Sequence, residues 1–247
     1  EDVVFHLDDH LERLRHSAQE LEIAQPTAIQ SSNAPALKSQ LKQLLRLNKF
    51  GASLVWFYVL AGLTSDGFTP IGEPVLLVRV SKFDEAALCS KQGIAVKTVN
   101  AVRQMPEIKC VADYALAEVM LARFAPQGFD EILYSSHGAF FELSRKNFFL
   151  VLPNGTILTP NKDILQGITR RIVIDLARGL KIPVVLREIV SRDIARAKEA
   201  FATSTACGIA PLNRIDDRVL KPGKITKKLQ KAFLGSREKY FTEVGDP

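Results

Sequence analysis

Lys109 stands just before the run Tyr114–Phe124, in which apolar residues recur at helical spacing. This pattern predicts a lysine held where a loop meets a helix, and we expect Leu116, Met120 and Leu121 to face a core. Desolvation at such a place disfavours the ammonium form, and a neutral amine is the nucleophile that forms a Schiff base with an aldehyde. The alternative is that Lys109 is one of many solvated lysines.

A carboxylate lies between bulky apolar residues further along the chain. Glu142 follows two phenylalanines in the run 139–143. If it points inward, it needs a cationic or hydrogen-bond-donating partner, because an unpaired buried charge is costly. Strand alternation places Glu142 opposite Phe141 and Leu143, so a glutamate that faces solvent is the alternative.

Two short segments have the composition of phosphate-binding backbone. Gly167, Ile168 and Thr169 begin a predicted helix, and a helix N-terminus presents free N–H groups and the positive end of the helix dipole. The run 203–208 consists of small and hydroxyl residues, which let backbone approach a ligand and supply short donors. An ordinary capped helix and an ordinary loop are the alternatives.

The composition limits the class of protein. The chain has 247 residues, of which 47% are hydrophobic and 24% charged, so it can bury a large core in one domain or two. No apolar run is long enough to span a bilayer and no signal-peptide pattern is present, which favours a cytoplasmic protein without membrane contact.

Cysteine, histidine and charge patterns exclude further classes. The three cysteines and four histidines form no ligand cluster, so we expect no metal site and free thiols in a reducing compartment. The net charge of +6 comes from scattered basic residues. The densest group, 221–231, alternates with apolar residues as on a solvated helix face, so we expect no nucleic-acid partner.

The order of elements predicts two α/β units: a small N-terminal domain over 1–86 and a larger C-terminal domain over 87–247. The chain enters a strand-like run at 1–6 without an initiator methionine, so we expect an N-terminal piece to be missing from this sequence. A helix over 7–21 follows, with an aspartate as its N-cap. Arg13 lies off the apolar face of that helix, where a surface arginine would lie.

The remaining elements follow from apolar period and turn signals. The dipeptide at Asn154 and Gly155 predicts a hairpin, because it tolerates the positive φ angles of a tight turn. Helices are expected over 35–47 and 168–180 and up to Ala200, and strands within 52–63 and over 74–80, 131–136, 139–144, 147–153, 156–159 and 183–189.

In their order and spacing, these residues resemble one family: the class IV aminotransferases. These are pyridoxal-phosphate enzymes of fold type IV, and they include branched-chain and D-amino-acid aminotransferases and aminodeoxychorismate lyase. The resemblance runs from Phe5 to about Leu229. It implies an α/β (α+β) protein of two domains with pyridoxal 5′-phosphate between them, usually a homodimer whose partner subunit borders each site.

The resemblance also implies roles. Lys109 matches the Schiff-base lysine, Tyr114 the tyrosine that hydrogen-bonds the phenolic oxygen of the cofactor, and Glu142 the glutamate that pairs with the pyridine nitrogen. Glu142 would keep that nitrogen protonated, so that the ring accepts electrons when a bond to Cα breaks. Arg13 matches the arginine that grips the phosphate. The other expected cofactor-binding residues are Gly167, Ile168, Thr169, Ser204 and Thr205.

Departures from the family pattern leave the substrate open. Leu143 stands where the family usually has glycine, and Ala52–Leu63 carries no arginine, whereas many members use a basic residue there to meet a substrate carboxylate. We expect a class IV aminotransferase that acts on a small amino acid of the branched-chain or D-amino-acid type. The alternatives are a lyase that releases pyruvate and 4-aminobenzoate from 4-amino-4-deoxychorismate, and a catalytically silent cofactor-binding protein.

Overall fold

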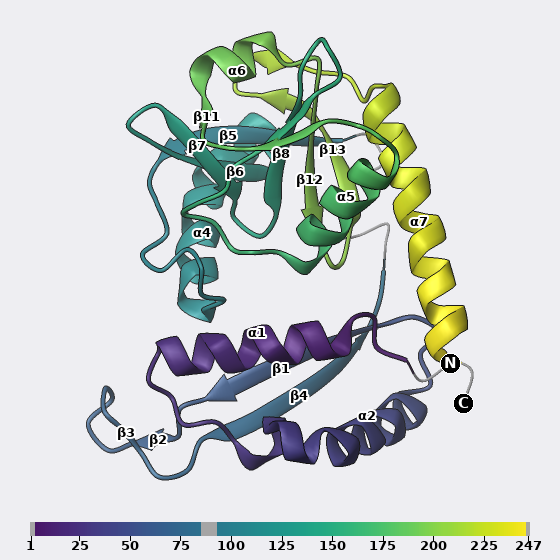
Figure 1. Ribbon diagram of the computed structural model, residues 1–247. Coiled ribbons are helices and arrows are strands. Elements are labelled where there is room, and N and C mark those ends of the chain that lie inside the picture. Colours follow the sequence, from purple (N-terminus) through teal and green to yellow (C-terminus); the bar gives the residue numbers. More distant parts are fainter. Residues whose placement is uncertain (1–2, 85–92, 246–247) are drawn as a thin grey trace. The chain divides into compact units, whose positions relative to one another are not determined.

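The computed structural model describes residues 3–84 and 93–245 of the chain (Figure 1). The chain forms two compact units: unit 1 contains residues 1–84 and 237–247, and unit 2 contains residues 85–236. The predicted domain boundary between residues 86 and 87 lies outside the described residues, as does Cys89.

The C-terminal end differs from the predicted division, because the residues from Arg237 onward belong to unit 1. Aromatic contacts explain this. The ring of Tyr240 stacks on His6 with centroids 4.6 Å apart, and the ring of Phe241 lies 5.8 Å from that of Phe5.

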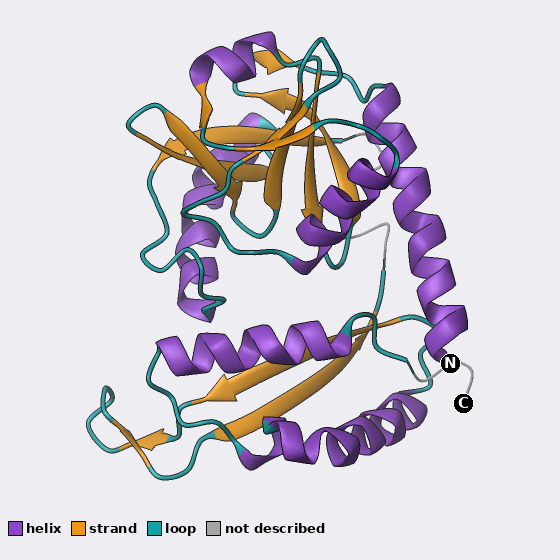
Figure 2. Ribbon diagram, viewed as in Figure 1, coloured by secondary structure: helices purple, strands orange, loops and turns teal. Residues whose placement is uncertain are grey.

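Unit 1 packs two helices with a small antiparallel sheet (Figure 2). Leu11 and Leu41, one from each helix, share a core with Ile29 and with strand residues such as Val55 and Val78. The elements of unit 1 are α1 (Leu7–Glu20), the 3-10 turns η1 (Thr27–Ile29) and η2 (Ser31–Asn33), α2 (Ala34–Asn48), β1 (Ser53–Leu60), β2 (Leu63–Thr64), β3 (Pro70–Ile71) and β4 (Val75–Lys82). The predicted helix over 35–47 and the two predicted long strands are confirmed.

The first residues of unit 1 correct two expectations. Residues 3–6 form no strand, because His6 adopts a left-handed conformation with φ of 50° and α1 begins directly after it. His6 also takes the N-cap position that we predicted for an aspartate. Asp9 instead accepts a 2.7 Å hydrogen bond from His6 Nδ1 in the first turn.

Unit 2 is built on a large mixed sheet. Its elements are β5 (Ile94–Asn100), α4 (Val111–Phe124), the 3-10 turn η3 (Ala125–Gln127), β6 (Glu131–Ser136), β7 (Ala139–Leu143), β8 (Asn147–Val151), β9 (Ile157–Thr159), α5 (Ile168–Gly179), β10 (Val184–Leu186), β11 (Ile189–Val190), α6 (Ser191–Arg196), β12 (Glu199–Ser204), β13 (Gly208–Ile215), β14 (Arg218–Val219) and α7 (Lys224–Gly245), the last of which continues into unit 1.

The sheet closes on itself. Its order is β10-β9-β8-β12-β13-β5-β6-β7-β11, and an additional pairing of β7 with β8 joins the strands from β8 to β7 into a ring. That closing pairing consists of Glu142 opposite Asn147. Phe148, Leu133 and Leu212 are fully buried in the core, and α4 and α5 lie on different sides of the strands (Figure 1).

The predicted hairpin is confirmed: Gly155 has φ of 84°, and Asn154 Oδ1 accepts a hydrogen bond from the Thr156 N–H. The predicted helix through Ala200 is present as α6, but it ends earlier, at Arg196. From Glu199 the chain forms β12 between β8 and β13. Alanine-rich sequence favours helix, but burial between two strands overrides that propensity.

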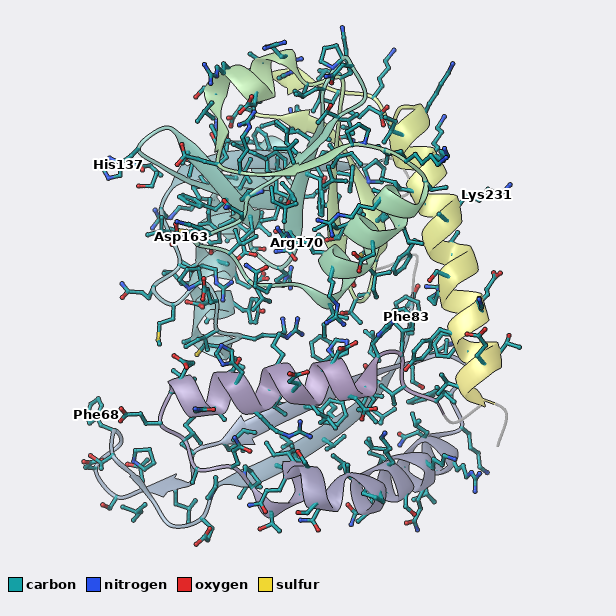
Figure 3. The ribbon with its side chains drawn as sticks, viewed as in Figure 1. Phe68, Phe83, His137, Asp163, Arg170 and Lys231 are labelled. Atoms are coloured by element: carbon teal, nitrogen blue, oxygen red, sulfur yellow. The ribbon has the colours of Figure 1, made fainter. Side chains whose placement is uncertain are left out.

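A buried carboxylate caps the first turn of helix α7. Glu199 accepts hydrogen bonds from the backbone N–H groups of Ile225 and Thr226, which have no partner within the helix. Leu229 is fully buried, while Lys231 extends away from the ribbon (Figure 3). The predicted solvated basic face is therefore confirmed.

Within the described ranges, no helix is long and apolar enough to cross a membrane. Residues 3–84 and 93–245 also contain no group of three His, Cys, Asp or Glu side chains placed to hold a metal ion.

Candidate active site

Lys109 and Tyr114 meet at the start of α4. Lys109 Nζ donates a 2.6 Å hydrogen bond to Tyr114 Oη, and the ammonium lies 5.0 Å from the centre of that ring. Because α4 begins at Val111, Tyr114 sits in its first turn and its side chain reaches back to the lysine. The sequence therefore correctly predicted that a loop and a helix fix this lysine.

Two details of that expectation are wrong. Lys109 is exposed, so the described residues do not desolvate it; its charged end is held by a hydroxyl and an aromatic face instead. Leu116 is 59% exposed, whereas Met120 and Leu121 pack on the buried Ala117 as expected. The apolar side of α4 is thus wider than its contact with the sheet.

Glu142 is buried with 4% of its surface exposed, which excludes the solvent-facing alternative. Its Oε1 accepts hydrogen bonds from Arg103 Nη1 at 2.6 Å and from the Leu165 N–H at 3.1 Å, and its Oε2 accepts one from Asn147 Nδ2 at 3.0 Å. A carboxylate oxygen has two lone pairs. Among the described residues, Oε1 is therefore saturated, and Oε2 keeps one lone pair for another donor.

Burial and nearby cations oppose each other at this carboxylate. Burial raises the pKa of Glu142 to about 7, and the Arg103 guanidinium, the Leu165 N–H and the Lys109 ammonium hold it below the value that burial alone would give. Glu142 therefore changes charge near neutral pH. Its charge state depends on whichever donor approaches the remaining lone pair.

Arg103 lies opposite Glu142 and is itself buried. Burial alone would lower the pKa of Arg103, but its ion pairs with Glu142 and Asp113 raise it overall. Its guanidinium also donates to the carbonyl oxygens of Pro106 and Ile108 at 3.0 and 2.5 Å.

Asn147 connects Glu142 to the start of α5. Its Nδ2 donates to Glu142 and, at 2.7 Å, to the carbonyl oxygen of Leu165. Its Oδ1 fills the space beside Gly167: a Cβ at residue 167 would lie 2.0 Å from that oxygen. The glycine is required because the backbone passes so close to the Asn147 side chain.

The first turn of α5 has the features of an anion site. Gly167 is the N-cap, and the backbone N–H groups that follow it, including those of Ile168 and Thr169, have no acceptor within the helix. Thr169 is buried with 3% of its surface exposed. Arg170 is also buried, and burial lowers its pKa while Glu142 partly offsets that effect. Figure 3 shows Arg170 within unit 2, among the side chains around this helix.

Ser204 is the last residue of β12, and Thr205 begins the turn between β12 and β13. Ser204 Oγ accepts a hydrogen bond from the Cys207 N–H, so this hydroxyl stabilises the turn. Thr205 is exposed. Because Thr203 pairs with Asn147 across β12 and β8, the turn follows directly after a strand that borders the Asn147 strand.

Arg13 lies on α1 of unit 1 and is half-buried, with Nη2 3.4 Å from His10 Nδ1. Its predicted contact with a phosphate stays a prediction, as do the cofactor-binding and catalytic roles of the unit 2 residues above.

Two cavities border these groups within unit 2. One, of about 280 Å³, opens beside the start of α5 and is lined by Gly167, Ile168, Arg170 and Arg171 among others. The other, of about 420 Å³, is lined by residues that include Arg103, Tyr134, Phe141, Glu142, Asp163 and Glu188.

Sequence reasoning missed Arg103, Asp113 and the packing of Asn147 against Gly167. An arginine in a polar segment between a strand and a helix has the pattern of a surface residue, and no local signal marks it as buried. The contact of Asn147 with Gly167 joins two segments that are 20 residues apart in the sequence, so no local pattern predicts it.

Comparison with known proteins identifies the family. The family described as amino-transferase class IV matches residues 1–215. A protein of Methanocaldococcus jannaschii named putative branched-chain-amino-acid aminotransferase is 33% identical to this chain, over 99% of the chain and 86% of its own length. The chain belongs to the class IV aminotransferases. The family, the α+β fold class and the identification as an enzyme are therefore confirmed.

Solved structures agree in fold with this class IV aminotransferase. The branched-chain aminotransferase of Thermoproteus uzoniensis, solved with norvaline, has a TM-score of 0.81 at 28% identity and covers 96% of this chain and 82% of its own. The branched-chain amino acid aminotransferase of T.th., complexed with N-(5′-phosphopyridoxyl)-L-glutamate, has a TM-score of 0.81 at 24% identity, covering 94% and 78%. The second likeness concerns the fold alone.

Proposed function

We propose that this class IV aminotransferase transfers the amino group of a small amino acid, of the branched-chain or D-amino-acid type, with pyridoxal 5′-phosphate as its cofactor. The observation that carries the proposal is the arrangement within unit 2. Lys109 is held by Tyr114 at a helix start, and it lies close enough to the buried Glu142 to lower the pKa of that carboxyl.

The residues present fit the cofactor. Glu142 Oε2 keeps a lone pair that matches a protonated ring nitrogen, and the first turn of α5 offers Gly167, Ile168 and Thr169 to a phosphate. Ser204 and Thr205, at the end of β12 and in the turn after it, would add short hydrogen-bond donors to the phosphate. Arg13 remains the predicted cationic partner of the phosphate.

Each side chain then has a distinct task. When bound, the cofactor withdraws the electrons that are released at the α-carbon of the amino acid. Lys109 supplies the amine that attaches the cofactor and moves the proton at that carbon. Tyr114 orients the Lys109 amine through its hydroxyl. Glu142, in its ionised form, would hold the proton on the ring nitrogen.

The amino donor is inferred from the relatives. The Methanocaldococcus jannaschii relative is named for branched-chain amino acids, which favours that donor class over D-amino acids. The lyase alternative has less support, because several relatives that match nearly the whole chain are named aminotransferases.

We also propose a cytosolic homodimer. Leu116 and Val119 of α4 are 59% and 57% exposed, and Val111 on the same helix is 59% exposed, which is the kind of apolar face that a second copy of this chain would cover. Neither Cys110 nor Cys207 forms a disulfide bond within the described residues, which suits a reducing compartment. Conversion to monomer by Leu116→Glu, measured by light scattering, tests the dimer.

Borohydride reduction of the full chain loaded with cofactor tests the attachment site. Peptide mapping should find the reduced cofactor on Lys109, and a Lys109→Ala variant should carry none. Attachment to another lysine would contradict the whole assignment. Lys146, which is bound to Glu131 at 2.6 Å in the same unit, supplies the matched control as Lys146→Ala, which should still be labelled.

A panel of donors defines the substrate. The protein is supplied with 2-oxoglutarate and, in turn, L-leucine, D-alanine and 4-amino-4-deoxychorismate. Glutamate formation with leucine supports the proposed function. Pyruvate release from aminodeoxychorismate without glutamate formation would establish the lyase instead.

A further inference from the structure

Every donor of the Arg103 guanidinium is used. Nε and Nη2 donate to Asp113 Oδ2 at 3.1 and 3.0 Å, Nη1 donates to Pro106 O and Glu142 Oε1, and Nη2 donates to Ile108 O. An arginine has five N–H groups, so none is left for a ligand. Arg103 therefore acts on the site through its neighbours and not by contact with substrate.

These neighbours belong to three parts of the site. The Ile108 carbonyl forms the peptide bond to Lys109, and Asp113 precedes Tyr114 in the first turn of α4. Glu142 lies on β7, at the pairing that closes the ring of strands. One planar group thus fixes the backbone before the lysine, the turn that carries its tyrosine, and the carboxylate.

The ion pair is buried on both sides. The side chains of Arg103 and Glu142 are 4% and 5% exposed. A buried carboxylate that loses its bonded cation takes up a proton, because desolvation disfavours the charged form. A protonated Glu142 carboxyl carries its own hydrogen, so it cannot accept a hydrogen bond from a protonated ring nitrogen as a carboxylate does.

Other charged groups face Glu142 but do not replace Arg103. Lys109 lowers the pKa of Glu142, and Arg170 is influenced by the Glu142 charge from the start of α5. Tyr134, on β6, has its pKa raised by burial, with Glu142 adding to that effect. Of these groups, none is bonded to the Glu142 carboxylate within the described residues.

We propose that Arg103 is a positioning residue for transamination: one guanidinium holds the Lys109 turn and the Glu142 carboxylate in a single arrangement and favours the ionised form of that carboxylate. This inference rests on the proposed function. It adds that the charge of Glu142 and the placement of Lys109 are controlled by the same side chain.

The test follows the Glu142 carboxyl directly in cofactor-free full-length protein. NMR of side-chain-carboxyl ¹³C-glutamate is recorded against pH, and the Glu142→Gln variant identifies the resonance. The wild-type midpoint should lie near 7. In Arg103→Met it should rise by about 1–3 pH units, the range by which an adjacent opposite charge shifts a carboxylate.

A matched control separates this effect from general damage. Arg187 forms a two-pronged ion pair with Asp193 at 2.7 and 2.8 Å in the same unit. Arg187→Met removes an arginine–carboxylate pair away from Glu142, in which the Arg187 side chain is 39% exposed, and should leave the Glu142 midpoint unchanged. A midpoint in Arg103→Met equal to that of the wild type, or an equal shift in both variants, would overturn the proposal.

Arg103→Lys keeps the charge and loses the planar fork. It should shift the Glu142 midpoint less than Arg103→Met, yet it should slow the attachment of pyridoxal 5′-phosphate to Lys109, measured by the rise of the borohydride-fixed adduct. If Arg103→Met does not fold, this variant decides, and wild-type attachment together with a wild-type midpoint overturns the proposal. Failure of the proposed function would appear separately, as an adduct away from Lys109 in the wild type.

Discussion

Replacing Glu142 by glutamine removes one ionisable group from the interior of unit 2 and keeps its shape. Burial, opposed by Arg103 and by the Leu165 N–H, raises the pKa of Glu142 from 4.5 to about 7 on folding. Between these two pH values, the folded protein binds a proton that the unfolded chain has released.

The sign and size of the effect follow from that difference. The Glu142 carboxyl contributes stability that is fully present below pH 4.5 and is lost as the pH rises through 7. Each pKa unit corresponds to about 1.4 kcal/mol, so the free energy of unfolding falls by about 3 kcal/mol across the window. Glutamine does not titrate, so the difference in the free energy of unfolding between the wild type and Glu142→Gln changes by the same amount across this window.

Hydrogen exchange on cofactor-free protein measures this difference. The amides of Phe148, Phe149 and Leu150 on β8 report the opening of unit 2, whereas the single tryptophan, Trp56, lies in unit 1 and its fluorescence reports the other unit. The opening free energy of wild type minus variant should fall between pH 4.5 and 7. A difference that is flat in this window would refute the reasoning.

The variant also carries a cost that is independent of pH. A glutamine amide in place of Glu142 Oε2 would face Asn147 Nδ2, 3.0 Å away, so two donors would meet. This should cost about 1–3 kcal/mol at every pH. With cofactor bound, the charge-assisted bond to the ring is lost, so turnover should fall by about 10- to 150-fold while the cofactor stays attached. Near-normal turnover would mean that Glu142 does not partner the ring nitrogen.

Three further predictions concern the phosphate and the frame around it. Arg13→Ala should weaken binding of pyridoxal 5′-phosphate by about tenfold or more, measured by spectroscopic titration, because a charge-assisted hydrogen bond contributes about 1.5–3 kcal/mol. Thr205→Ala should weaken binding by less, because a neutral hydrogen bond contributes less. Unchanged affinity in Arg13→Ala would identify Arg13 as a surface residue. Gly167→Ala should lower the free energy of unfolding by about 1–3 kcal/mol, since its Cβ would meet Asn147. The control is Gly179→Ala at the other end of α5, where a Cβ meets nothing within 4 Å and should cost no packing energy. Equal urea midpoints for the two variants would contradict the packing argument. Glu199→Gln should lower thermal stability by about 1 kcal/mol through the lost charge at the start of α7, and Glu238→Gln, on an exposed part of that helix, is its control.

Local signals in the sequence predicted local structure. The leucines of α2 and the Asn154 and Gly155 turn each determine their own conformation within a few residues, and the structure has the element expected at each place. The order and spacing of Arg13, Lys109, Tyr114, Glu142, the segment 167–169 and Thr205 together indicated the family, because order and spacing are read without knowing the packing.

Long-range contacts decided what the sequence could not show. Glu142 is buried because β7 pairs with β8 to close the ring of strands. Arg103 is buried because it lies between that strand pairing and the start of α4. Neither fact has a signature in the neighbouring residues. The first two residues of β12, Glu199 and Ala200, were assigned to the preceding helix for the same reason: the local sequence carries no sign of the two strands that flank β12.

The parallel pairing of β13 with β5 has a consequence for synthesis on the ribosome. Asp216, just after β13, accepts hydrogen bonds from the Thr98 backbone and hydroxyl, 118 residues earlier in the chain. Lys109 and Glu142 are therefore translated long before their ring of strands can close. Until β13 emerges, β5 and β12 each present an unpaired edge, and such edges recruit other chains. A nascent chain of this enzyme that stalls before Gly208 should aggregate or bind chaperones, while one that extends past Leu220 should not.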